Sequence, residues 1–353
     1  MKIHLLSGFL GSGKTTAIRQ AAGILLQQGI KTGVISNDQG RHLVDGGLFT
    51  SLAIPNREVI NGCFCCNYKE LGNSISSLVA MHGTEIIFAE SVGSCTDLVA
   101  TVLKPLRQSR PDTPITISVF ADVRLLQMLL YKGSTGFDET VRYIYLKQLE
   151  EAGTIVINKI DLVTGRQLLA TRALLQKKYG HKHLLFQNSF NKENVQQWLN
   201  VIDADNSASA LPSLQIDYDV YASGEAKLAW ADRLVEIYSA DNNAPQLAAA
   251  LANKLYAAVC QQQYPIGHLK FFINNSLKIS FTAAGETMVP LVAGEAPSAS
   301  MIINMRVQTE PAYLTRLTDQ VFTLFETEHN CRIVISSQSA FQPGYPKPTH
   351  RLV

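Results

Sequence analysis

A phosphate-binding motif near the start of the sequence constrains the fold more than any other feature. Gly8–Thr15 has the sequence GFLGSGKT and matches the pattern G-x-x-x-x-G-K-[ST] at every fixed position. A short apolar run, 2–7, precedes it, and 16–28 has the apolar spacing of a helix that Gly29 would end. This is the strand-loop-helix context that the motif requires, so the sequence predicts a phosphate-binding loop. A glycine-rich turn without a ligand is the alternative, and the complete pattern disfavours it.

The residue types of the loop explain how it would hold a nucleotide. Its glycines let successive backbone N–H groups surround phosphate oxygens, and the N-terminus of the following helix adds partial positive charge. Lys14 would neutralise the β- and γ-phosphates, and the Thr15 hydroxyl would be a ligand of Mg²⁺. The residues expected to contact the phosphates are Gly8, Gly11, Ser12, Gly13, Lys14, Thr15 and Thr16.

A second motif indicates which base is bound. The β-branched run 154–157 predicts a strand, and Asn158, Lys159 and Asp161 follow it in the sequence NKID. The carboxylate of Asp161 would accept hydrogen bonds from the ring N–H and the exocyclic amine of guanine. Adenine would leave that carboxylate unpaired, at a cost of about 1–3 kcal/mol. A solvated turn would explain these residues in isolation, but after a strand and downstream of a phosphate loop they favour guanine.

A strand end later in the chain is suited to sense the γ-phosphate. The strand expected at 84–89 leads into Glu90, and Gly93 follows three residues later. Glu90 would reach Mg²⁺ through water, and Gly93 would offer its N–H to the γ-phosphate. A strand cap with a turn glycine is the alternative.

Another strand, expected at 32–36, ends in the sequence NDQG at a switch-like position. Asp38 in this sequence is a candidate ligand of Mg²⁺ or of its water. An Asx turn is the alternative, and both interpretations stay open. The expected catalytic residues are Lys14, Asp38 and Glu90.

Strands and helices are expected to alternate along residues 1–202. The expected strands lie near 2–7, 32–36, 57–60, 84–89, 115–121, 154–157 and 183–187. The expected helices lie near 14–28, 68–81, 95–108, 123–131, 138–151, 165–178 and 191–202. This alternation predicts an α/β fold, a mainly parallel P-loop NTPase sheet with flanking helices and ligands at the carboxyl ends of its strands.

The rest of the chain has a different pattern. A small, polar linker is expected at 203–213, and 214–353 is expected to form a smaller α+β C-terminal domain. Its expected strands lie near 214–222, 226–238, 267–274, 277–283, 301–308 and 331–336. Its expected helices lie near 244–262 and 311–329.

Composition restricts the compartment and the partners. The chain is 46% apolar and 17% charged with a net charge of +2, which gives no electrostatic argument for nucleic acid or an acidic membrane surface. The sequence has no run long enough to span a bilayer and no signal-peptide pattern, so we expect a cytoplasmic protein with reduced thiols.

Three of the six cysteines lie within four residues, in the sequence NGCFCCN. Clustered reduced thiols point to a metal or to redox chemistry, and Cys63, Cys65 and Cys66 are the candidate ligands. A structural zinc site needs four closed ligands, whereas three leave a position through which an ion could be exchanged. Thiolates favour zinc and also hold cobalt or copper(I). Small apolar filling is the alternative role, and it is a poor explanation for three thiols in a glycine-flanked loop.

Together these motifs resemble the CobW-like metallochaperone GTPases, which are related to the nickel-insertion GTPases of urease and hydrogenase. The resemblance rests on GFLGSGKTT, NDQGRHLVDGGL, EVINGCFCC, ESVG and NKID, in this order, over roughly residues 1–200. It implies a SIMIBI-class P-loop GTPase with a metal on Cys63, Cys65 and Cys66, and Glu58 as an accessory residue. The ESVGSCTDL run and the closing FQPGYPKPTHR resemble a divergent subgroup associated with corrinoid metabolism.

The sequence also departs from the family pattern. Asp38 stands where a glutamate is usual, and Gly153 stands where an acidic residue usually precedes the NKxD strand. Cys95, soon after ESVG, is either an extra ligand or an isolated buried cysteine. The eight histidines are scattered, which weakens the argument for zinc in particular.

The leading hypothesis is a GTPase that transfers a transition metal, Zn²⁺ or Co²⁺, to a client metalloprotein or corrinoid protein. GTP or GDP and Mg²⁺ are the other expected ligands, with Thr15, Asp38 and Glu90 around Mg²⁺. A nucleotide-gated interaction module for a corrinoid-dependent enzyme, with structural thiols, is the alternative, and an ATP-dependent kinase is a third. A homodimer is one expectation, and no nucleic acid or membrane partner is expected.

Overall fold

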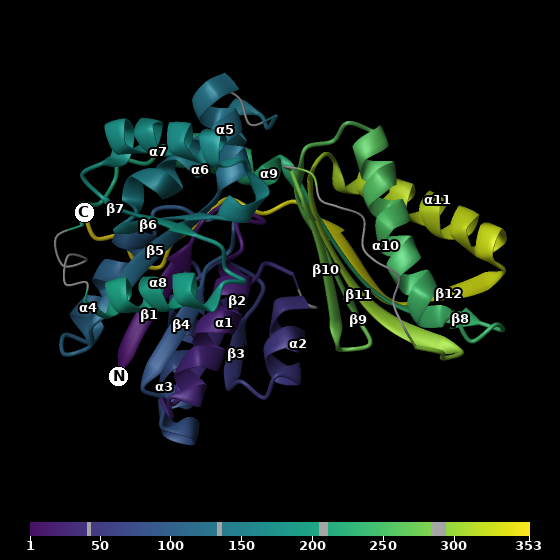
Figure 1. Cartoon of the computed structure of the whole chain (residues 1–353), viewed down its shortest axis with the longest axis horizontal. Helices are drawn as coiled ribbons and strands as arrows, with labels where there is room; N and C mark the ends of the chain where they lie inside the picture. The colour runs from purple at the N-terminus through teal and green to yellow at the C-terminus, as the bar shows by residue number, and fades with distance from the viewer. Residues whose placement is uncertain (41–43, 133–135, 205–210, 284, 286–293) are drawn as a thin grey trace. The chain divides into compact units, whose positions relative to one another are not determined.

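The structure is a computed structural model that describes the chain except residues 41–43, 133–135, 205–210, 284 and 286–293 (Figure 1). Contacts within the chain divide it into two compact units. The first is made of Met1–Gln39, Ala53–Gly224 and Pro346–Val353, and the second of Gly40–Leu52 and Glu225–Tyr345. Two short segments therefore belong to a different unit from their neighbours in sequence. The expected division into a domain at 1–202 and a domain at 214–353 stays a prediction. Part of the linker expected at 203–213 lies outside the described residues.

A seven-stranded parallel sheet forms the centre of the first unit. Its strand order is β3-β2-β4-β1-β5-β6-β7. The strands are β1 (Lys2–Ser7), β2 (Thr32–Asn37), β3 (Asn56–Val59), β4 (Ile86–Glu90), β5 (Ile115–Asp122), β6 (Thr154–Asn158) and β7 (His183–Gln187). Every residue of β2, β5 and β6 is buried, as expected for parallel strands covered on both faces. The predicted α/β sheet is confirmed.

Helices cover both faces of this sheet (Figure 1). They are α1 (Lys14–Gln27), α3 (Tyr68–His82), α4 (Lys104–Ser109), α5 (Val123–Lys132), α6 (Glu139–Glu151), α7 (Gly165–Tyr179) and α8 (Lys192–Ala204). Because the strands of this sheet are parallel, the carboxyl ends of β1, β2, β4 and β6 lie at the same edge of it. Each predicted nucleotide motif follows one of these strands.

The helix predicted near 95–108 differs in the structure. A π-helical turn, η1 (Val99–Leu103), precedes α4, and the Lys104 N–H donates to the Val99 carbonyl. Pro105 has no N–H to continue an α-helical ladder at this point. Within this π turn, the Ala100 carbonyl accepts a hydrogen bond from the Leu352 N–H at 2.9 Å. The turn therefore binds the C-terminal segment of the chain.

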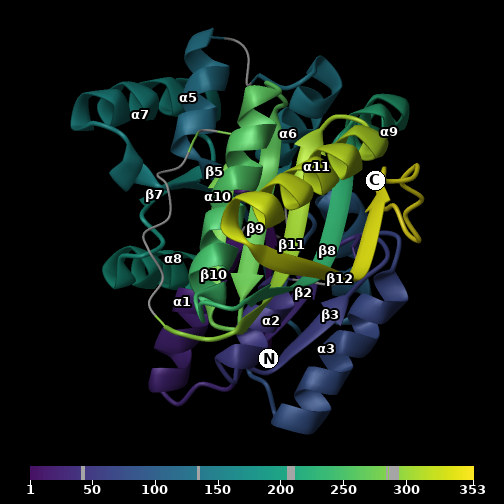
Figure 2. The same ribbon diagram turned by 90° about the vertical axis from the view of Figure 1, so that its right-hand side faces the viewer.

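The second unit is built on a five-stranded antiparallel sheet of order β10-β9-β11-β8-β12. Its strands are β8 (Leu228–Ser239), β9 (Ile266–Ile273), β10 (Leu277–Thr282), β11 (Ser298–Gln308) and β12 (Cys331–Phe341). The helices α10 (Ala244–Gln261) and α11 (Pro311–His329) lie across one face of it (Figure 2). Their apolar residues form one core with that face of the strands. The α+β makeup of this part is confirmed.

A helix from the first part of the sequence packs on the other face of this sheet. Val44 and Leu48 of α2 (Val44–Ser51) contact Phe272, whose neighbour Phe271 belongs to the core under α10 and α11. Asp45 at the start of α2 is paired with Lys270 and Lys278. The segment after the switch-like NDQG sequence is therefore part of the second unit.

The strand predicted near 214–222 is wrong, because these residues include α9 (Tyr218–Ala226). The sequence IDYDVY at 216–221 alternates apolar and acidic residues over most of its length, a pattern that is compatible with a strand. Asp217 favours the helix, because its carboxylate accepts hydrogen bonds from the backbone N–H groups of Asp219 and Val220 at 3.0 and 3.1 Å. These bonds satisfy the free donors of a helix N-terminus.

Among the described residues, no helix has both the length and the apolar character needed to cross a membrane.

Candidate functional site

The backbone of the phosphate-binding loop requires glycine at its two ends. Gly8 has φ +129°, and a Cβ there would lie 2.1 Å from the Phe120 carbonyl oxygen. Gly13 has φ +93°, and a Cβ there would lie 2.3 Å from Nδ2 of Asn158. Residues other than glycine adopt these positive φ angles only at a cost in conformational free energy. The loop is therefore held close to β5 on one side and to the NKID sequence on the other.

Lys14 and Thr15 begin α1 inside this loop. Lys14 is buried, and its Nζ donates to the Gly8 carbonyl at 2.7 Å. The Thr15 hydroxyl donates to Oε1 of Glu90 at 3.0 Å. The structure thus brings together a hydroxyl and a carboxylate, two oxygen ligands that suit Mg²⁺. Asp38 lies at the carboxyl end of β2, next to β4 in the sheet, and its N–H donates to the Val59 carbonyl at 3.2 Å.

The NKID sequence contacts the phosphate loop directly. Nδ2 of Asn158 donates to the Ser12 carbonyl at 2.9 Å. Lys159 has φ +62°, and its Nζ lies 3.0 Å from Oδ2 of Asp122. Asp161 is exposed in the short helix η2 (Ile160–Leu162), where a base can reach it from solvent. The structure therefore holds Asn158 and Lys159 in place and leaves Asp161 accessible.

Two residues at this end of the sheet were missed in the sequence. Ser189 follows β7, and its N–H and hydroxyl both donate to Oδ1 of Asn158, at 3.1 and 2.8 Å. Asp122 ends β5; burial raises its pKa, but hydrogen bonds from Arg124 and the charge of Lys159 outweigh burial and keep the pKa below its usual range. Asp122 could have been found, because it stands at the end of a predicted strand. Nothing in the sequence around Ser189 indicates a contact with the NKID sequence.

The segment after β4 lies against the phosphate loop. A Cβ on Gly93 would lie 2.9 Å from the Leu10 backbone nitrogen, so only glycine allows this approach. The buried Gln148 of α6 donates from Nε2 to the carbonyls of Gly93 and Cys95, at 3.0 and 2.8 Å. Residues 90–97 are therefore fixed both to the nucleotide loop and to α6. Gln148 was not predicted as a functional residue.

The three clustered thiols form a potential metal centre. The sulfur of Cys63 lies 2.7 Å from that of Cys65 and 3.3 Å from that of Cys66, and the Cys65–Cys66 distance is 3.9 Å. Cys63 and Cys65 are buried, and Cys66 is half-buried. A tetrahedral zinc with sulfurs at about 2.3 Å keeps them about 3.8 Å apart, so a small separation of Cys63 from Cys65 would admit the ion. Among the described residues these three form the only such group of potential ligands.

The three thiols of the cluster differ in their pKa values. Hydrogen bonds from Cys65 and Cys66 hold the pKa of Cys63 well below its usual range. Hydrogen bonds with Cys63 and Cys66 raise the pKa of Cys65 well above its usual range, and the bond to Cys63 raises the pKa of Cys66 to about 11. Cys63 is therefore the first thiolate of the cluster. Metal binding must release the remaining protons, which makes the affinity depend on pH.

Two other parts of the first unit contact this thiol loop. Nδ2 of Asn37, at the end of β2, donates to the carbonyls of Val59 and Gly62 at 2.8 and 2.7 Å. Lys347, in the C-terminal segment, donates its N–H to the sulfur of Cys66 at 3.4 Å. The loop therefore connects the switch-like strand end with the C-terminus of the chain. Neither contact was predicted.

The same C-terminal segment holds the thiol loop at further points. Thr349 donates its N–H to the Cys65 carbonyl at 2.8 Å and its hydroxyl to the Cys66 carbonyl at 3.0 Å. Glu58, the expected accessory residue, is exposed on β3.

Residues 2–186 match the family described as CobW/HypB/UreG, nucleotide-binding domain. The chain is 36% identical over 180 residues to the Zinc chaperone YjiA of Escherichia coli, which covers 48% of this chain and 52% of that protein. It is 26% identical over 189 residues to the Zinc chaperone YeiR of the same organism, covering 52% of this chain and 54% of YeiR. The match thus spans about half the length of each relative.

The comparison with solved structures finds HypB from Helicobacter pylori in complex with nickel. It has a TM-score of 0.44 and 14% identity, and the match covers 61% of this chain and 92% of HypB. The family match extends over more than half of the chain and includes the phosphate loop, the thiol loop and the NKID sequence. The protein belongs to the CobW/HypB/UreG family of P-loop GTPases.

Proposed function

We propose that this protein is a GTP-hydrolysing metallochaperone that carries a transition metal on Cys63, Cys65 and Cys66 and passes it to a client protein. The observation that carries the proposal is a cluster of two buried thiols and one half-buried thiol on a loop that is hydrogen-bonded to the end of β2. Two similar proteins are called zinc chaperones, which supports zinc as the first metal to test. Cobalt is the second.

The nucleotide part of the proposal rests on the residues around the phosphate loop. Lys14 stabilises the charge that develops on the γ-phosphate, and Asp38 orients the attacking water at the end of β2. Thr15 and Glu90 would hold Mg²⁺, which neutralises phosphate charge when bound. Asp161 selects guanine. We expect slow intrinsic hydrolysis, because no arginine finger can be assigned among the described residues.

The metal part of the proposal rests on incomplete coordination. Three cysteine ligands leave a position at which a ligand of the client can enter, whereas a closed four-ligand site would retain the ion. Loss of the γ-phosphate reshapes the switch-like segment, and Asn37 passes the change to the thiol loop. A corrinoid protein as client, a homodimer and a cytoplasmic location stay predictions from the sequence.

The base preference is tested by comparing GTP and ATP binding to the parent and to Asp161→Asn. Exchange of the carboxylate for an amide removes the acceptor that pairs with guanine, so GTP affinity should fall by a factor of about ten or more, while ATP affinity stays weak. Asp112→Asn is the matched control, since Asp112 is exposed and distant in sequence from every nucleotide motif. Equal GTP affinity of the parent and Asp161→Asn would contradict the guanine assignment.

The metal part is tested with the triple variant Cys63→Ser, Cys65→Ser and Cys66→Ser. We expect the parent to bind one zinc and its GTP hydrolysis to respond to the metal, and the triple variant to lose both properties. Cys260→Ser is the control, because Cys260 is exposed on α10. If the parent binds no metal in any nucleotide state, the proposal fails and a nucleotide-gated interaction module with structural thiols is favoured.

A further inference from the structure

The C-terminal segment, Pro346–Val353, belongs to the same compact unit as the thiol loop. It lies along this unit without forming a helix or a strand (Figure 1). Pro346 and Pro348 have no N–H to donate, and they favour an extended backbone. Because the segment has no regular structure of its own, its remaining backbone groups bond to other parts of the unit.

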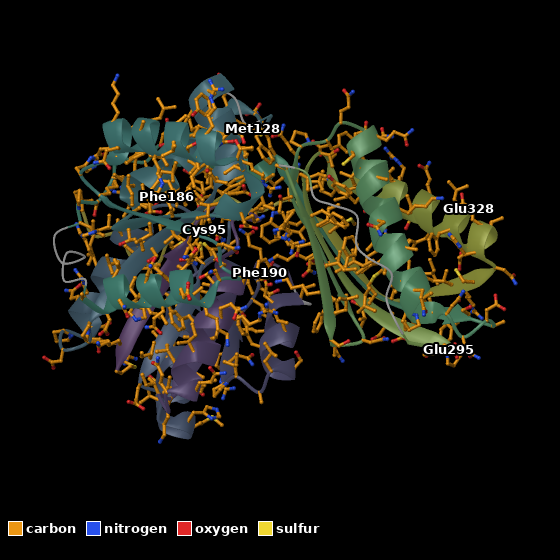
Figure 3. The ribbon with its side chains drawn as sticks, viewed as in Figure 1. Cys95, Met128, Phe186, Phe190, Glu295 and Glu328 are labelled. Atoms are coloured by element: carbon orange, nitrogen blue, oxygen red, sulfur yellow. The ribbon has the colours of Figure 1, made fainter. Side chains whose placement is uncertain are left out.

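One end of the segment is anchored in the interior of the unit. The Leu352 carbonyl accepts the Ser213 hydroxyl at 2.6 Å, and Arg351 is paired with the buried Asp97. Asp97 comes two residues after Cys95, which is fully buried inside this unit (Figure 3). Residues 351–352 therefore hold the segment to a buried part of the fold.

The other end of the segment is bonded to the cysteines. Thr349 donates its N–H to the Cys65 carbonyl and its hydroxyl to the Cys66 carbonyl. The Lys347 N–H donates to the sulfur of Cys66 at 3.4 Å. Cys63 and Cys65 are buried, whereas Cys66 is half-buried. The segment thus contacts the sulfur of the cluster that is most accessible to solvent.

We infer that the Lys347 N–H positions Cys66 as the ligand through which the metal leaves, and that the C-terminal segment retains the ion until it detaches. This inference rests on the proposed function, because it concerns the metal on the three thiols. A divalent ion with three thiolates has a net charge of −1, and an N–H donor stabilises that charge at the sulfur. The segment adds no ligand, so the open coordination position is kept.

Detachment of the segment would prepare the transfer step. Without the N–H donor, the bond between the metal and Cys66 is easier to break. A thiol of the client enters the open position and forms a bond from its sulfur to the metal, and the bond to Cys66 then breaks. The proton that the client thiol gives up passes to the Cys66 thiolate, so atoms and charge balance and no electron is transferred.

Two variants at one position isolate the N–H donor. Lys347→Pro removes it, and the backbone accepts the ring because Pro348 already favours extended conformations at position 347. Lys347→Ala keeps the N–H and removes only the side chain. The zinc-loaded proteins are mixed with an excess of a chromogenic chelator, and the rate of zinc transfer is measured. Loss of one hydrogen bond should raise this rate about 2- to 10-fold in Lys347→Pro, and Lys347→Ala should match the parent.

Cobalt absorption separates an effect at the sulfur from a general loosening of the fold. An N–H donor lowers the energy of the sulfur lone pairs, so its loss makes transfer of charge from sulfur to cobalt easier. In the Co²⁺-loaded Lys347→Pro variant, the sulfur-to-cobalt charge-transfer band should therefore move to longer wavelength. In Lys347→Ala the band should stay where it is in the parent.

The possible results separate this inference from the proposed function. A parent that binds neither zinc nor Co²⁺ would overturn both. If the parent binds metal, an unchanged transfer rate in Lys347→Pro, or a faster one without the band shift, would overturn the role of Lys347 alone.

If Lys347→Pro fails to fold, hydrogen exchange of the parent decides. It is measured on a peptide that spans 342–353, with and without zinc. A metal-bound thiolate accepts a hydrogen bond more strongly than a neutral thiol does, so slower exchange with zinc supports the inference. Equal exchange in the two states overturns it.

Discussion

The side-chain carbonyl of Asn37 accepts a hydrogen bond from the backbone N–H of Phe64 at 2.8 Å. Asn37 is the last residue of β2, immediately before the switch-like segment, and Phe64 lies between the cysteines of the metal loop. With the two bonds that Asn37 donates to Val59 and Gly62, this contact joins the strand end to both sides of the loop. These three bonds provide a path by which a displacement of the end of β2 would move the loop that carries the thiols.

Replacement of Asn37 should weaken metal binding while leaving the nucleotide site intact. Asn37→Ala leaves the buried N–H of Phe64 and two carbonyls without their partner and lets the loop relax. We expect zinc affinity to fall about 10- to 100-fold, measured by competition with a chelator. GDP affinity should stay near that of the parent. Asn73→Ala, at an exposed position on α3, is the control, and unchanged zinc affinity in Asn37→Ala would contradict the link.

The C-terminal segment should stabilise the first unit through one ion pair. Nε of Arg351 donates to Oδ2 of Asp97 at 2.7 Å, and the Tyr218 hydroxyl donates to the same oxygen at 2.7 Å. Burial raises the pKa of Asp97, although these two groups favour its charged form. Arg351→Ala should lower the free energy of unfolding by about 1.5–3 kcal/mol in urea denaturation, since a hydrogen bond to a charged group is lost.

Two further variants determine whether the pair itself is responsible. Arg332→Ala removes an exposed arginine of β12 and should have little effect. In a background of Asp97→Asn, Arg351→Ala should cost much less than in the parent, because the buried charge is gone. Additive losses would show that Arg351 acts independently of Asp97.

Glu151 should make the protein less stable as the pH rises. Burial, and to a smaller extent the charge of Asp97, raises the pKa of this carboxyl from 4.5 to about 8. Between these pH values the unfolded chain loses the proton and the folded chain keeps it. The free energy of unfolding therefore falls by about 1.4 kcal/mol per pH unit from this group.

Glu151→Gln removes this dependence. Urea denaturation at pH 5 and pH 8 should show that the variant gains stability relative to the parent at the higher pH. Glu193→Gln, at an exposed site on α8, should follow the parent at both. A parent and a Glu151→Gln variant with the same pH dependence would contradict the burial of a neutral carboxyl.

Asp45 should have the opposite pH dependence. Burial raises its pKa, but Lys270 and Lys278 outweigh this effect and lower the pKa well below its usual value of 3.8. Its contribution is complete above that value and is lost as the pH falls below it. At pH 7, Asp45→Asn should lower the free energy of unfolding by about 1.5–3 kcal/mol, because two half-buried lysines lose a charged hydrogen-bond partner. At pH 3 the difference should be smaller; an equal loss at both pH values would contradict the ion-pair origin.

The parts of the site that were predictable are those encoded in short stretches of sequence. The phosphate loop needs particular φ angles at Gly8 and Gly13 and a lysine at one position, so its motif carries its geometry. The thiol loop was recognised for the same reason. Both follow strands whose β-branched and apolar runs are short and distinct.

The parts that were not predictable depend on contacts between distant residues. Lys347 and Cys66 are 281 positions apart, and nothing in either stretch indicates the other. Likewise α2 was not predicted, because Val44 and Leu48 acquire their apolar partners only from Phe272 and its strand. The burial of Cys95 is also not evident from the sequence, because it depends on segments that are distant along the chain.

The central claim is that nucleotide state and metal affinity are coupled through the thiol loop. The most direct test measures zinc affinity of the parent by chelator competition, with GDP and with a non-hydrolysable GTP analogue. The account predicts affinities that differ by about 5- to 150-fold, and linkage requires zinc to change the affinity for the analogue by the same factor. Equal zinc affinities in the two nucleotide states would contradict it.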